Sequence, residues 1–305
     1  MNRAVLGIDT SNYTTSAALV CDGRVVENRR ILLEVPQGVR GLRQSDAIFL
    51  HTKNLPEIIG SLGKNDISAV GVSVRPRDAE GSYMPCFLAG KAVASSVASL
   101  YGVPCFEFSH QAGHIMAALY SCGREDLKGK RFIAFHVSGG TTELLLVDND
   151  IIEKKGGTLD ISAGQLIDRV GVKLGMKFPC GRELEQISAP LDSVNCISHV
   201  RGLDFNLSGA ENVISKMIDD GLSRGEIAAF TFKTVLRTLE RLAENAIEEF
   251  GDIPIVFAGG VMSNRRIRHE LSKKFNAFFA ESEYSCDNAA GTALLAERSL
   301  IELKD

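Results

Sequence analysis

Residues Phe132 to Asn149, FIAFHVSGGTTELLLVDN, hold the pattern from which the fold can be predicted. Phe132 to Val137 is apolar, Ser138 to Thr142 is a turn of glycines and hydroxyl residues, and Leu144 to Val147 is apolar again. Asp148-Asn149 then gives a second turn signal. This order predicts two strands joined by a turn that offers backbone N–H groups to anionic oxygens.

The same order of strands and turns occurs near the N-terminus. Ala4 to Asp9 and Ser16 to Cys21 are apolar runs, and Asp22-Gly23 is a hairpin turn signal. Aligning Val20 with Val147 gives a repeat at an offset of 127 residues. Two domains built on one plan would explain both this repeat and a length of 305 residues, which is too long for a minimal single core.

Helical patterns separate these strands. Gly90 to Leu100 predicts a helix of small residues, and Glu226 to Phe250 has apolar residues at helical spacing. Ile253 to Phe257 predicts a buried strand, after which Ser263 or Asn264 caps a further helix. Strands that alternate with helices in this way predict the α/β class.

Composition excludes several classes of protein. A net charge of -4 excludes a generally basic nucleic-acid coat protein, although it allows a local basic rim. No apolar run reaches the roughly 18 residues of a membrane helix, and the first residues predict no secretory leader. The 7 cysteines contain no Cys-x-x-Cys pair, so we expect a reduced, cytoplasmic protein without a disulfide framework.

Three turns rich in glycine or hydroxyl residues each follow an apolar strand. They are Asp9 to Thr15, Ser138 to Thr142 and Gly259 to Asn264. None matches the P-loop or the Rossmann fingerprint, and any one alone could simply close a tight turn. Together they resemble the phosphate and nucleotide turns of the actin-like superfamily.

His110 and His114 are four residues apart, in the sequence His-Gln-Ala-Gly-His. On a helix this spacing puts both imidazoles on one face, where they could share a metal ion. Asp287 is the best distant candidate for a third ligand, and two histidines with a carboxylate suit Fe(II) or Zn(II) and leave positions open for substrate. Histidines with a purely structural role are the alternative.

Short motifs follow one another from residue 4 to residue 296: Gly7-Ile-Asp-Thr-Ser11, His110 to His114, Val137-Ser-Gly-Gly140, Thr158-Leu-Asp160, Ala163-Gly164 with Asp168, Pro179 with Gly181, Asp204-Phe205 with Ser208-Gly209, Ala258-Gly-Gly-Val261 with Asn264, and Asp287-Asn288. This ordered set resembles the TsaD family, also called Gcp and once regarded as glycoproteases. The set is specific, although each motif is short.

The resemblance implies an α/β protein of the actin-like ATPase fold (ASKHA, RNase H-like), with two similar domains around a nucleotide cleft. The first domain would be residues 1–109 with 288–305, and the second residues 110–287. The implied enzyme is an acyltransferase of tRNA processing. It would move a threonylcarbamoyl group from threonylcarbamoyl-AMP to the N6 amine of the adenosine beside the tRNA anticodon. The implied partners are tRNA, TsaB-like and TsaE-like proteins, and a separate synthase that makes the donor, with no membrane.

The resemblance also implies roles for individual residues. His110, His114 and Asp287 would bind one divalent metal, iron or zinc, and no catalytic residue is expected beyond that site. An adenine nucleotide (threonylcarbamoyl-AMP, AMP or ATP) would contact His136, Val137, Ser138, Gly139, Gly140, Asp168, Gly181, Glu185 and Asn264. Asp168 and Glu185 would receive the ribose hydroxyls, with a plain surface carboxylate as the alternative for Asp168.

Several turns depart from the family pattern: Asn12-Tyr13-Thr14-Thr15, Arg75 to Met84, Thr141-Thr142-Glu143, Ala163-Gly164-Gln165 and Pro179-Cys180-Gly181. Such changes suggest a divergent paralogue, with another carbamoyl acceptor as the alternative. His136 stands where archaeal relatives place a metal-binding tyrosine, which makes it a candidate third imidazole ligand. A strand-end histidine is the other interpretation.

Three other functions fit part of the sequence. A non-catalytic TsaB-like scaffold would share the fold, but it would not need the two histidines and Asp287. A metallopeptidase would need a glutamate beside the histidines, and a sugar kinase would not explain them. Basic residues cluster at four places that could form a tRNA-binding rim or simply be solvated: Arg24-Arg29-Arg30, Arg40-Arg43, Lys128-Lys130-Arg131 and Arg265-Arg266-Arg268.

Overall fold

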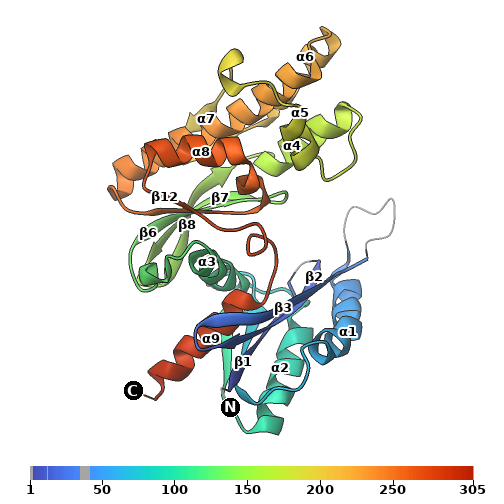
Figure 1. Cartoon of the computed structure of the whole chain (residues 1–305), viewed down its shortest axis with the longest axis vertical. Coiled ribbons are helices and arrows are strands. Elements are labelled where there is room, and N and C mark those ends of the chain that lie inside the picture. The colour runs from blue at the N-terminus through green and yellow to red at the C-terminus, as the bar shows by residue number, and fades with distance from the viewer. Residues whose placement is uncertain (1–2, 12, 35–41, 305) are drawn as a thin grey trace. The chain divides into compact units, whose positions relative to one another are not determined.

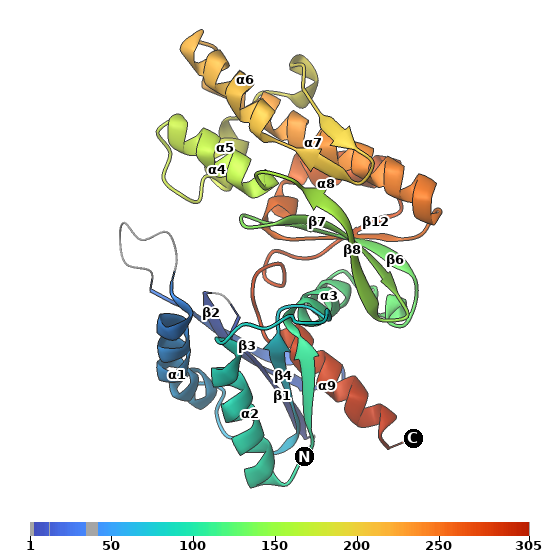
Figure 2. The same cartoon turned by 180° about the vertical axis from the view of Figure 1, so that it is seen from behind.

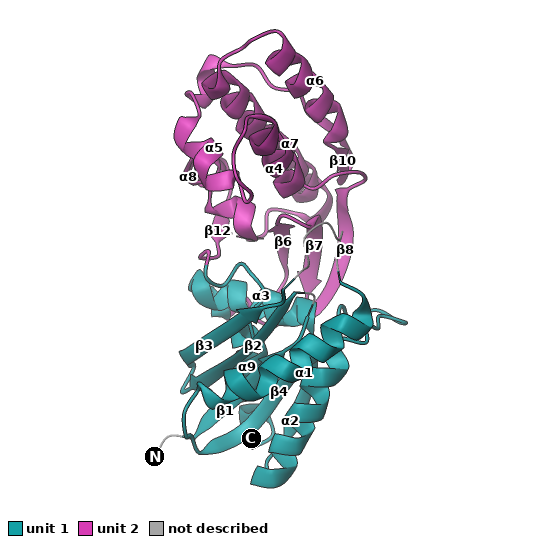
Figure 3. Cartoon of the chain, turned by 90° about the vertical axis from the view of Figure 1, so that its right-hand side faces the viewer, with its two compact units in different colours: residues 1–125, 283–305 teal, residues 126–282 magenta. Residues whose placement is uncertain are grey.

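The computed structural model describes residues 3–11, 13–34 and 42–304, so the predicted roles of Asn12 and Arg40 lie outside the described residues. The chain forms two compact units, residues 1–125 with 283–305, and residues 126–282 (Figure 3). The short 3-10 helix η1 (Glu125–Leu127) spans the division in the sequence. The bounds that the sequence suggests for two domains, at residues 109 and 288, stay a prediction.

Unit 1 is built around a five-stranded sheet with the strand order β3-β2-β1-β4-β5. Its elements are β1 (Ala4–Asp9), β2 (Thr14–Cys21), β3 (Arg24–Leu32), α1 (Gln44–Gly60), β4 (Ile67–Arg75), α2 (Phe87–Tyr101), β5 (Cys105–Ser109), α3 (His110–Ser121) and α9 (Ala290–Glu302). Figures 1 and 2 show α1 and α2 on one face of this sheet and α3 and α9 on the other.

Alternation along β1 explains why both faces of this sheet are covered by helices. Leu6 and Ile8 belong to the core that includes Leu55 of α1 and Ala94 of α2. Gly7 points to the other face, where a Cβ would come within 2.5 Å of the carbonyl oxygen of Ala289, just before α9. Successive side chains of a strand point to opposite faces, so the same strand supports the α1–α2 layer and the α9 layer.

Unit 2 contains a seven-stranded sheet with the strand order β12-β11-β6-β7-β8-β10-β9. Its strands are β6 (Phe132–Val137), β7 (Thr142–Asp148), β8 (Ile151–Thr158), β9 (His199–Arg201), β10 (Asp204–Asn206), β11 (Ile255–Ala258) and β12 (Ala277–Phe279). Its helices are α4 (Ala163–Lys173), α5 (Gly181–Ile187), η2 (Leu191–Ser193), α6 (Ser208–Asp219), α7 (Arg224–Phe250), η3 (Gly260–Ser263) and α8 (Arg265–Lys274).

The repeat at an offset of 127 residues is confirmed as a repeat of structure. In unit 1, β1, β2 and β3 form an antiparallel meander in which Val5 pairs with Val20. In unit 2, β6, β7 and β8 form the same meander, and Phe132 pairs with Val147 in the equivalent register. The second turn of unit 2 lies one residue later than the sequence suggests, because Asn149 and Asp150 are the residues with positive φ. The predicted α/β class is confirmed.

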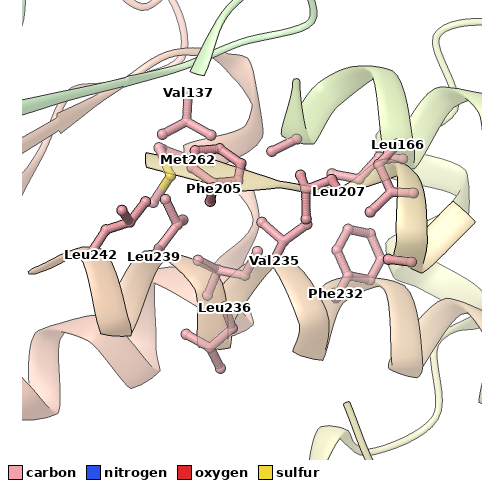
Figure 4. Close-up of a cluster of buried hydrophobic side chains, with 14 of the residues drawn as sticks. Val137, Leu166, Phe205, Leu207, Phe232, Val235, Leu236, Leu239, Leu242 and Met262 are labelled. Atoms are coloured by element: carbon pink, nitrogen blue, oxygen red, sulfur yellow. The ribbon is translucent and has the colours of Figure 1, made fainter. Parts of the chain in front are cut away.

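The core of unit 2 forms where helices pack on its sheet. Helix α7 has 27 residues and begins at a capping box between Ser223 and Glu226. Its buried face includes Phe232 and Leu239, which belong to one apolar cluster with Phe205 of β10 (Figure 4). Each such side chain contributes about 1.5–3 kcal/mol when fully buried, so this cluster holds the sheet and α7 together.

None of the helices in the described part of the chain combines the length and the apolar character that a bilayer-spanning segment needs.

A carboxylate joins the end of β8 to the start of α6. Asp160 accepts hydrogen bonds from the backbone N–H groups of Leu207 at 2.9 Å, Ser208 at 3.0 Å and Ile161 at 2.6 Å. Burial raises the pKa of Asp160, but these hydrogen bonds lower the pKa by a larger amount. The net pKa lies well below the ordinary range for aspartate. This contact explains why Thr158-Leu-Asp160 and the Ser208 region both stand out as motifs.

The substitution Asp160→Asn should lower the free energy of unfolding at pH 7 by about 1–2 kcal/mol, because the charge-assisted hydrogen bonds are lost from an exposed, screened site. A lowered pKa in the folded state contributes stability that is fully present above the unfolded pKa of about 3.9. This stability decreases below that pH and is lost as the pH falls through the folded-state pKa. Urea unfolding of both proteins at pH 7 and pH 3 should therefore show a difference that shrinks in acid.

The matched control for this measurement is Asp252→Asn. Asp252 is exposed, and no described residue donates a hydrogen bond to its carboxylate. A loss of stability equal to that of Asp160→Asn would contradict the role given to Asp160.

Candidate functional site

The two predicted histidines lie together in the first turn of α3. This helix begins at His110 because Ser109, which is buried, caps it by accepting a hydrogen bond from the N–H of Ala112 at 3.1 Å. The ring centroids of His110 and His114 are 4.3 Å apart. The predicted helix, and the shared face of the two imidazoles, are thus present within unit 1.

Asp287 joins the two histidines from a segment of unit 1 that follows residue 282. Its Oδ1 atom lies 3.5 Å from Nε2 of His110 and 3.3 Å from Nε2 of His114. One ligand-type atom from each residue lies within 4.8 Å of the others, and all three side chains are partly buried. The structure thus brings together residues that are far apart in the chain.

These distances fit a bound metal ion. Nitrogen and oxygen ligands bind zinc-type ions at about 2.0–2.2 Å, so neighbouring ligand atoms in tetrahedral or octahedral sites are separated by about 3.0–3.5 Å. The two nitrogen-to-oxygen separations, 3.3 and 3.5 Å, lie in that range. Two imidazoles and one carboxylate would leave further coordination positions open.

Two glycines allow α3 and α9 to approach closely enough to form this cluster. A Cβ on Gly291 would come 1.9 Å from the carbonyl oxygen of Gly113, and a Cβ on Gly113 would come 2.9 Å from the hydroxyl oxygen of Thr292. No side chain fits at that separation. Because Gly113 directly precedes His114 and Gly291 lies four residues after Asp287, the contact sets the distance between the ligand-type groups.

Charge is strongly coupled among these side chains. Burial lowers the pKa of His110, but the carboxylates of Asp9 and Asp287 raise it, and the net pKa is raised well above its usual value. Burial raises the pKa of Asp287, while its hydrogen bonds with the two imidazoles lower it more, so this carboxyl is ionised. Because a metal ion must displace protons from imidazole, metal binding here should strengthen as pH rises.

Asp9 contacts His110 in this cluster, although the sequence alone did not indicate that contact. It ends β1, has an exposed fraction of 0%, and lies with Oδ2 3.1 Å from Nδ1 of His110. Ser11 donates a hydrogen bond to the same Oδ2 at 2.6 Å. The motif Gly7-Ile-Asp-Thr-Ser11 suggested only a turn that could receive phosphate.

The loop from Arg75 to Met84 holds the N-terminal end of α3. Arg75 donates to Oδ1 of Asp78 at 2.6 and 3.0 Å, and Ser109 donates to Oδ2 of Asp78 at 2.7 Å. The N–H of Gln111 donates to the carbonyl of Pro76 at 3.1 Å. This loop therefore fixes the capping serine that directly precedes His110.

In unit 2, the predicted nucleotide residues Val137, Ser138, Gly139 and Gly140 lie at the end of β6 and in the turn that follows it. The N-terminus of α4 packs against that turn: Ser162 donates to the carbonyl of Gly139 at 2.9 Å, and a Cβ on Gly164 would come 2.5 Å from Gly139. A Cβ on Gly259, which follows β11, would meet the carbonyl of Val137 at 2.2 Å. Glycine is thus required at both close approaches.

The remaining predicted nucleotide residues form a chain of contacts in unit 2. Asp168 of α4 accepts from the N–H of Cys180 at 2.8 Å, next to Gly181 at the start of α5. Glu185 of α5 accepts from the N–H of Arg265 at 2.8 Å, next to Asn264. Burial raises the pKa of Asp168, although the hydrogen bond from Cys180 opposes this.

Asn264 has a polar atom that no described residue satisfies. Its side-chain oxygen caps α8 by accepting from the N–H groups of Arg266 at 3.1 Å and Ile267 at 3.0 Å, which confirms one of the two predicted caps. The side-chain Nδ2 is buried and has no hydrogen-bond partner among the described residues. A buried donor without an acceptor is costly, so this atom calls for an acceptor that the described residues do not supply.

His136 lies on β6 in unit 2, directly opposite Glu143 of β7. Glu143 is buried and pairs with Lys154 at 3.2 Å. A metal-binding role of His136 stays a prediction.

Some residues of the four predicted basic clusters have local hydrogen-bond or ion-pair partners. Lys128 pairs with Asp150, and Arg131 with Asp148 at 3.4 Å. Arg266 donates to the carbonyls of Ser188 and Ala189. A docking role of the four basic clusters stays a prediction.

Solved structures with similar folds come from several families. One is full-length HypF in a phosphate- and nucleotide-bound form, with 15% identity and a TM-score of 0.63. The match covers 99% of this chain but 47% of HypF, so the chain spans about half of it. Another is the activator of 2-hydroxyisocaproyl-CoA dehydratase from Clostridium difficile with bound ADPNP, at 16% identity, a TM-score of 0.57, and 99% and 97% coverage.

A ROK-family glucokinase from Streptomyces griseus gives a TM-score of 0.55 at 12% identity, with 97% of this chain and 99% of that chain covered. These proteins have the actin-like ATPase fold, which confirms the fold class expected for this chain.

Curated relatives narrow the similarity further. The tRNA N6-adenosine threonylcarbamoyltransferase of Thermosipho africanus is 30% identical over 95% of this chain and 92% of its own length. The enzyme of that name from Methanopyrus kandleri is 26% identical over 93% and 84%. The family model for TsaD, tRNA N6-adenosine threonylcarbamoyltransferase, matches residues 47–294, a range that holds His110, His114 and Asp287. The chain therefore belongs to the TsaD family of transferase enzymes.

Proposed function

We propose that this protein is a metal-dependent transferase that moves a threonylcarbamoyl group from threonylcarbamoyl-AMP to the N6 amine of the adenosine next to the tRNA anticodon. The observation that carries the metal dependence is the convergence of His110, His114 and Asp287, with separations of 3.3 and 3.5 Å at Asp287. Membership of the TsaD family supports the reaction and the tRNA substrate.

His110, His114 and Asp287 would hold one divalent ion, iron or zinc, through Nε2, Nε2 and Oδ1. When bound, such an ion supplies Lewis-acid polarisation of a carbonyl oxygen, which would favour attack by a weak amine nucleophile. The protein's own part is to hold the three side chains at fixed separation through the Gly113–Gly291 contact. No further catalytic residue is proposed.

An adenine nucleotide would bind along the loops of unit 2. Gly139 and Gly140 are exposed residues, and no described residue accepts a hydrogen bond from their backbone N–H groups, which suits an anionic phosphate. Asp168 Oδ2 and Glu185 Oε2 accept no hydrogen bond from the described residues, which suits ribose hydroxyls. Val137, Gly181 and His136 would line the same site.

The other components follow from the reaction. A separate synthase would supply threonylcarbamoyl-AMP, and TsaB-like and TsaE-like proteins would assist, as the resemblance implies. One curated relative, from Thermoplasma acidophilum, is named a probable bifunctional tRNA threonylcarbamoyladenosine biosynthesis protein, which supports a place in that modification. We propose that the protein works in the cytoplasm, where the tRNA is found.

The direct test is tRNA modification in a reconstituted mixture of this protein, threonine, bicarbonate, ATP, the synthase and unmodified tRNA, followed by mass spectrometry of the digested nucleosides. We expect threonylcarbamoyladenosine to form in the complete mixture. We expect none when either tRNA or the protein is omitted. If the protein binds metal and nucleotide but tRNA stays unmodified with TsaB-like and TsaE-like proteins added, the tRNA acceptor is wrong and another carbamoyl acceptor must be sought.

The substitution Asn264→Asp tests the nucleotide site without removing the helix cap. Aspartate keeps an oxygen that can accept from Arg266 and Ile267, but it replaces the unsatisfied Nδ2 donor by an acceptor. The loss of one buried hydrogen bond to the ligand should raise the Kd for AMP by roughly 10- to 100-fold. Calorimetric titration measures this value; an unchanged Kd with unchanged stability would show that Nδ2 does not meet the nucleotide.

A further inference from the structure

A fully buried carboxylate lies behind His110, on the side away from Asp287. Asp9 has an exposed fraction of 0%, and its Oδ2 and Oδ1 atoms lie 3.1 and 3.3 Å from Nδ1 of His110. The other ring nitrogen, Nε2, faces Oδ1 of Asp287 at 3.5 Å. The two nitrogens of one imidazole therefore face two different carboxylates, one buried and one at the candidate metal site.

Ser11 fixes the orientation of this carboxylate. Its hydroxyl donates to Oδ2 of Asp9 at 2.6 Å, and both residues are buried. Because the serine bonds to the carboxylate and not to the imidazole, the order Ser11–Asp9–His110 differs from a Ser–His–Asp hydrolase, in which the histidine stands in the middle. The arrangement does not activate Ser11 as a nucleophile.

We propose that Asp9 is the positioning residue of the metal centre, holding the proton of His110 on Nδ1 so that the lone pair of Nε2 points to His114 and Asp287. This inference rests on the proposed metal site. A neutral imidazole carries one proton, and the hydrogen bond made by one nitrogen decides which nitrogen is left to bind a metal. A carboxylate behind a ligand histidine also increases the basicity of the ligand.

The burial of Asp9 supports this role. An ionised carboxylate that is removed from water is costly unless it is hydrogen-bonded or paired, and Ser11 and His110 are the partners that its side chain has. Asp9 itself touches Nδ1, the nitrogen remote from Asp287, and so it stands behind the ligand-type groups rather than among them. Its position at the end of β1, a central strand of the sheet, makes the support rigid.

The test compares the full-length protein with Asp9→Ala, Asp9→Asn and Ser11→Ala, using Zn²⁺ as the probe. Zinc affinity is measured by competition with a chromophoric chelator, and the ring nitrogens and their protons are followed by NMR in protein labelled with ¹⁵N-histidine. Thermal unfolding of the metal-free proteins reports on folding alone.

Loss of a group behind a ligand histidine typically costs about 10- to 100-fold in metal affinity, and we expect this for Asp9→Ala. We expect a smaller loss for Ser11→Ala, which keeps the carboxylate. In the zinc-bound wild-type protein, His110 should carry its proton on Nδ1, and the slowly exchanging signal of that proton should vanish in Asp9→Ala.

Zinc affinity and an Nδ1 proton that are unchanged in Asp9→Ala would overturn the proposal. If Asp9→Ala does not fold, zinc affinity alone decides, in Asp9→Asn, which keeps an oxygen acceptor but lacks the charge, and in Ser11→Ala. Wild-type zinc affinity in both variants would then overturn the proposal. A wild-type protein that binds no zinc, yet shows the protected Nδ1 proton, would refute the metal site itself. The failure of the proposed function is thus distinguishable from the failure of this inference.

Discussion

The substitution Asp287→Asn should remove tight metal binding and, with it, transferase activity. Oδ1 of Asp287 is the atom that both Nε2 nitrogens face, at 3.5 and 3.3 Å. Removal of one partner from a buried charged cluster costs about 3–5 kcal/mol, which corresponds to roughly 150- to 4,000-fold in affinity. Zinc titration of the metal-free protein gives the affinity, and nucleoside mass spectrometry gives the activity.

The matched control is Glu283→Gln, four residues earlier. Glu283 is exposed and is not part of the group formed by His110, His114 and Asp287, so its amide form should keep the wild-type zinc affinity. Equal zinc affinity of Asp287→Asn and the wild-type protein would show that Asp287 is not a ligand. An equal loss in both variants would point to a general effect of charge in this segment.

The substitution Gly291→Ala should damage stability and metal binding together. The new methyl group would lie 1.9 Å from the carbonyl oxygen of Gly113 and 2.8 Å from the nitrogen of Ala117, and backbone atoms cannot rotate away. Overpacking of a core typically costs 1–3 kcal/mol, and we expect about 3 kcal/mol here because the obstacle is backbone. Helix α9 must move away from α3, which draws Asp287 away from the histidines.

Urea unfolding of the metal-free protein and zinc titration measure these two effects, and Gly60→Ala is the control. Gly60 is the last residue of α1, and a Cβ there would meet nothing within 4 Å. Alanine at such a position should be neutral or stabilise the protein by up to about 1 kcal/mol. Wild-type zinc affinity in Gly291→Ala would contradict the idea that the helix contact sets the site.

Local patterns in the sequence predicted much of the fold. The strand–turn–strand pattern of residues 132–149 and its repeat at 4–23 predicted β1, β2, β6 and β7, and the equivalent pairs Val5–Val20 and Phe132–Val147 confirm the repeat. Such patterns are readable because alternation and turn residues act over a few neighbours. The order of strands in each sheet depends on contacts between distant residues, and only the structure provided it.

In the candidate site too, local spacing could be predicted from the sequence, whereas contacts between distant residues could not. The spacing of His110 and His114 placed them on one face because a helix repeats every 3.6 residues. Asp287 was named as the best distant candidate for a third ligand. Asp9 was missed, because its contact with His110 spans 101 residues of sequence. The roles of Gly113 and Gly291 were also hidden, since a close helix contact leaves no pattern beyond two isolated glycines.

The most direct test of metal-dependent transfer is the yield of threonylcarbamoyladenosine in the reconstituted reaction as metal is added back to chelator-treated protein. We expect no product without metal, and a yield that rises until one ion is bound per chain and then stays constant. We also expect that a His110→Ala variant forms no product at any metal concentration. Full yield from the metal-free protein, or full yield from His110→Ala, would contradict metal-dependent transfer.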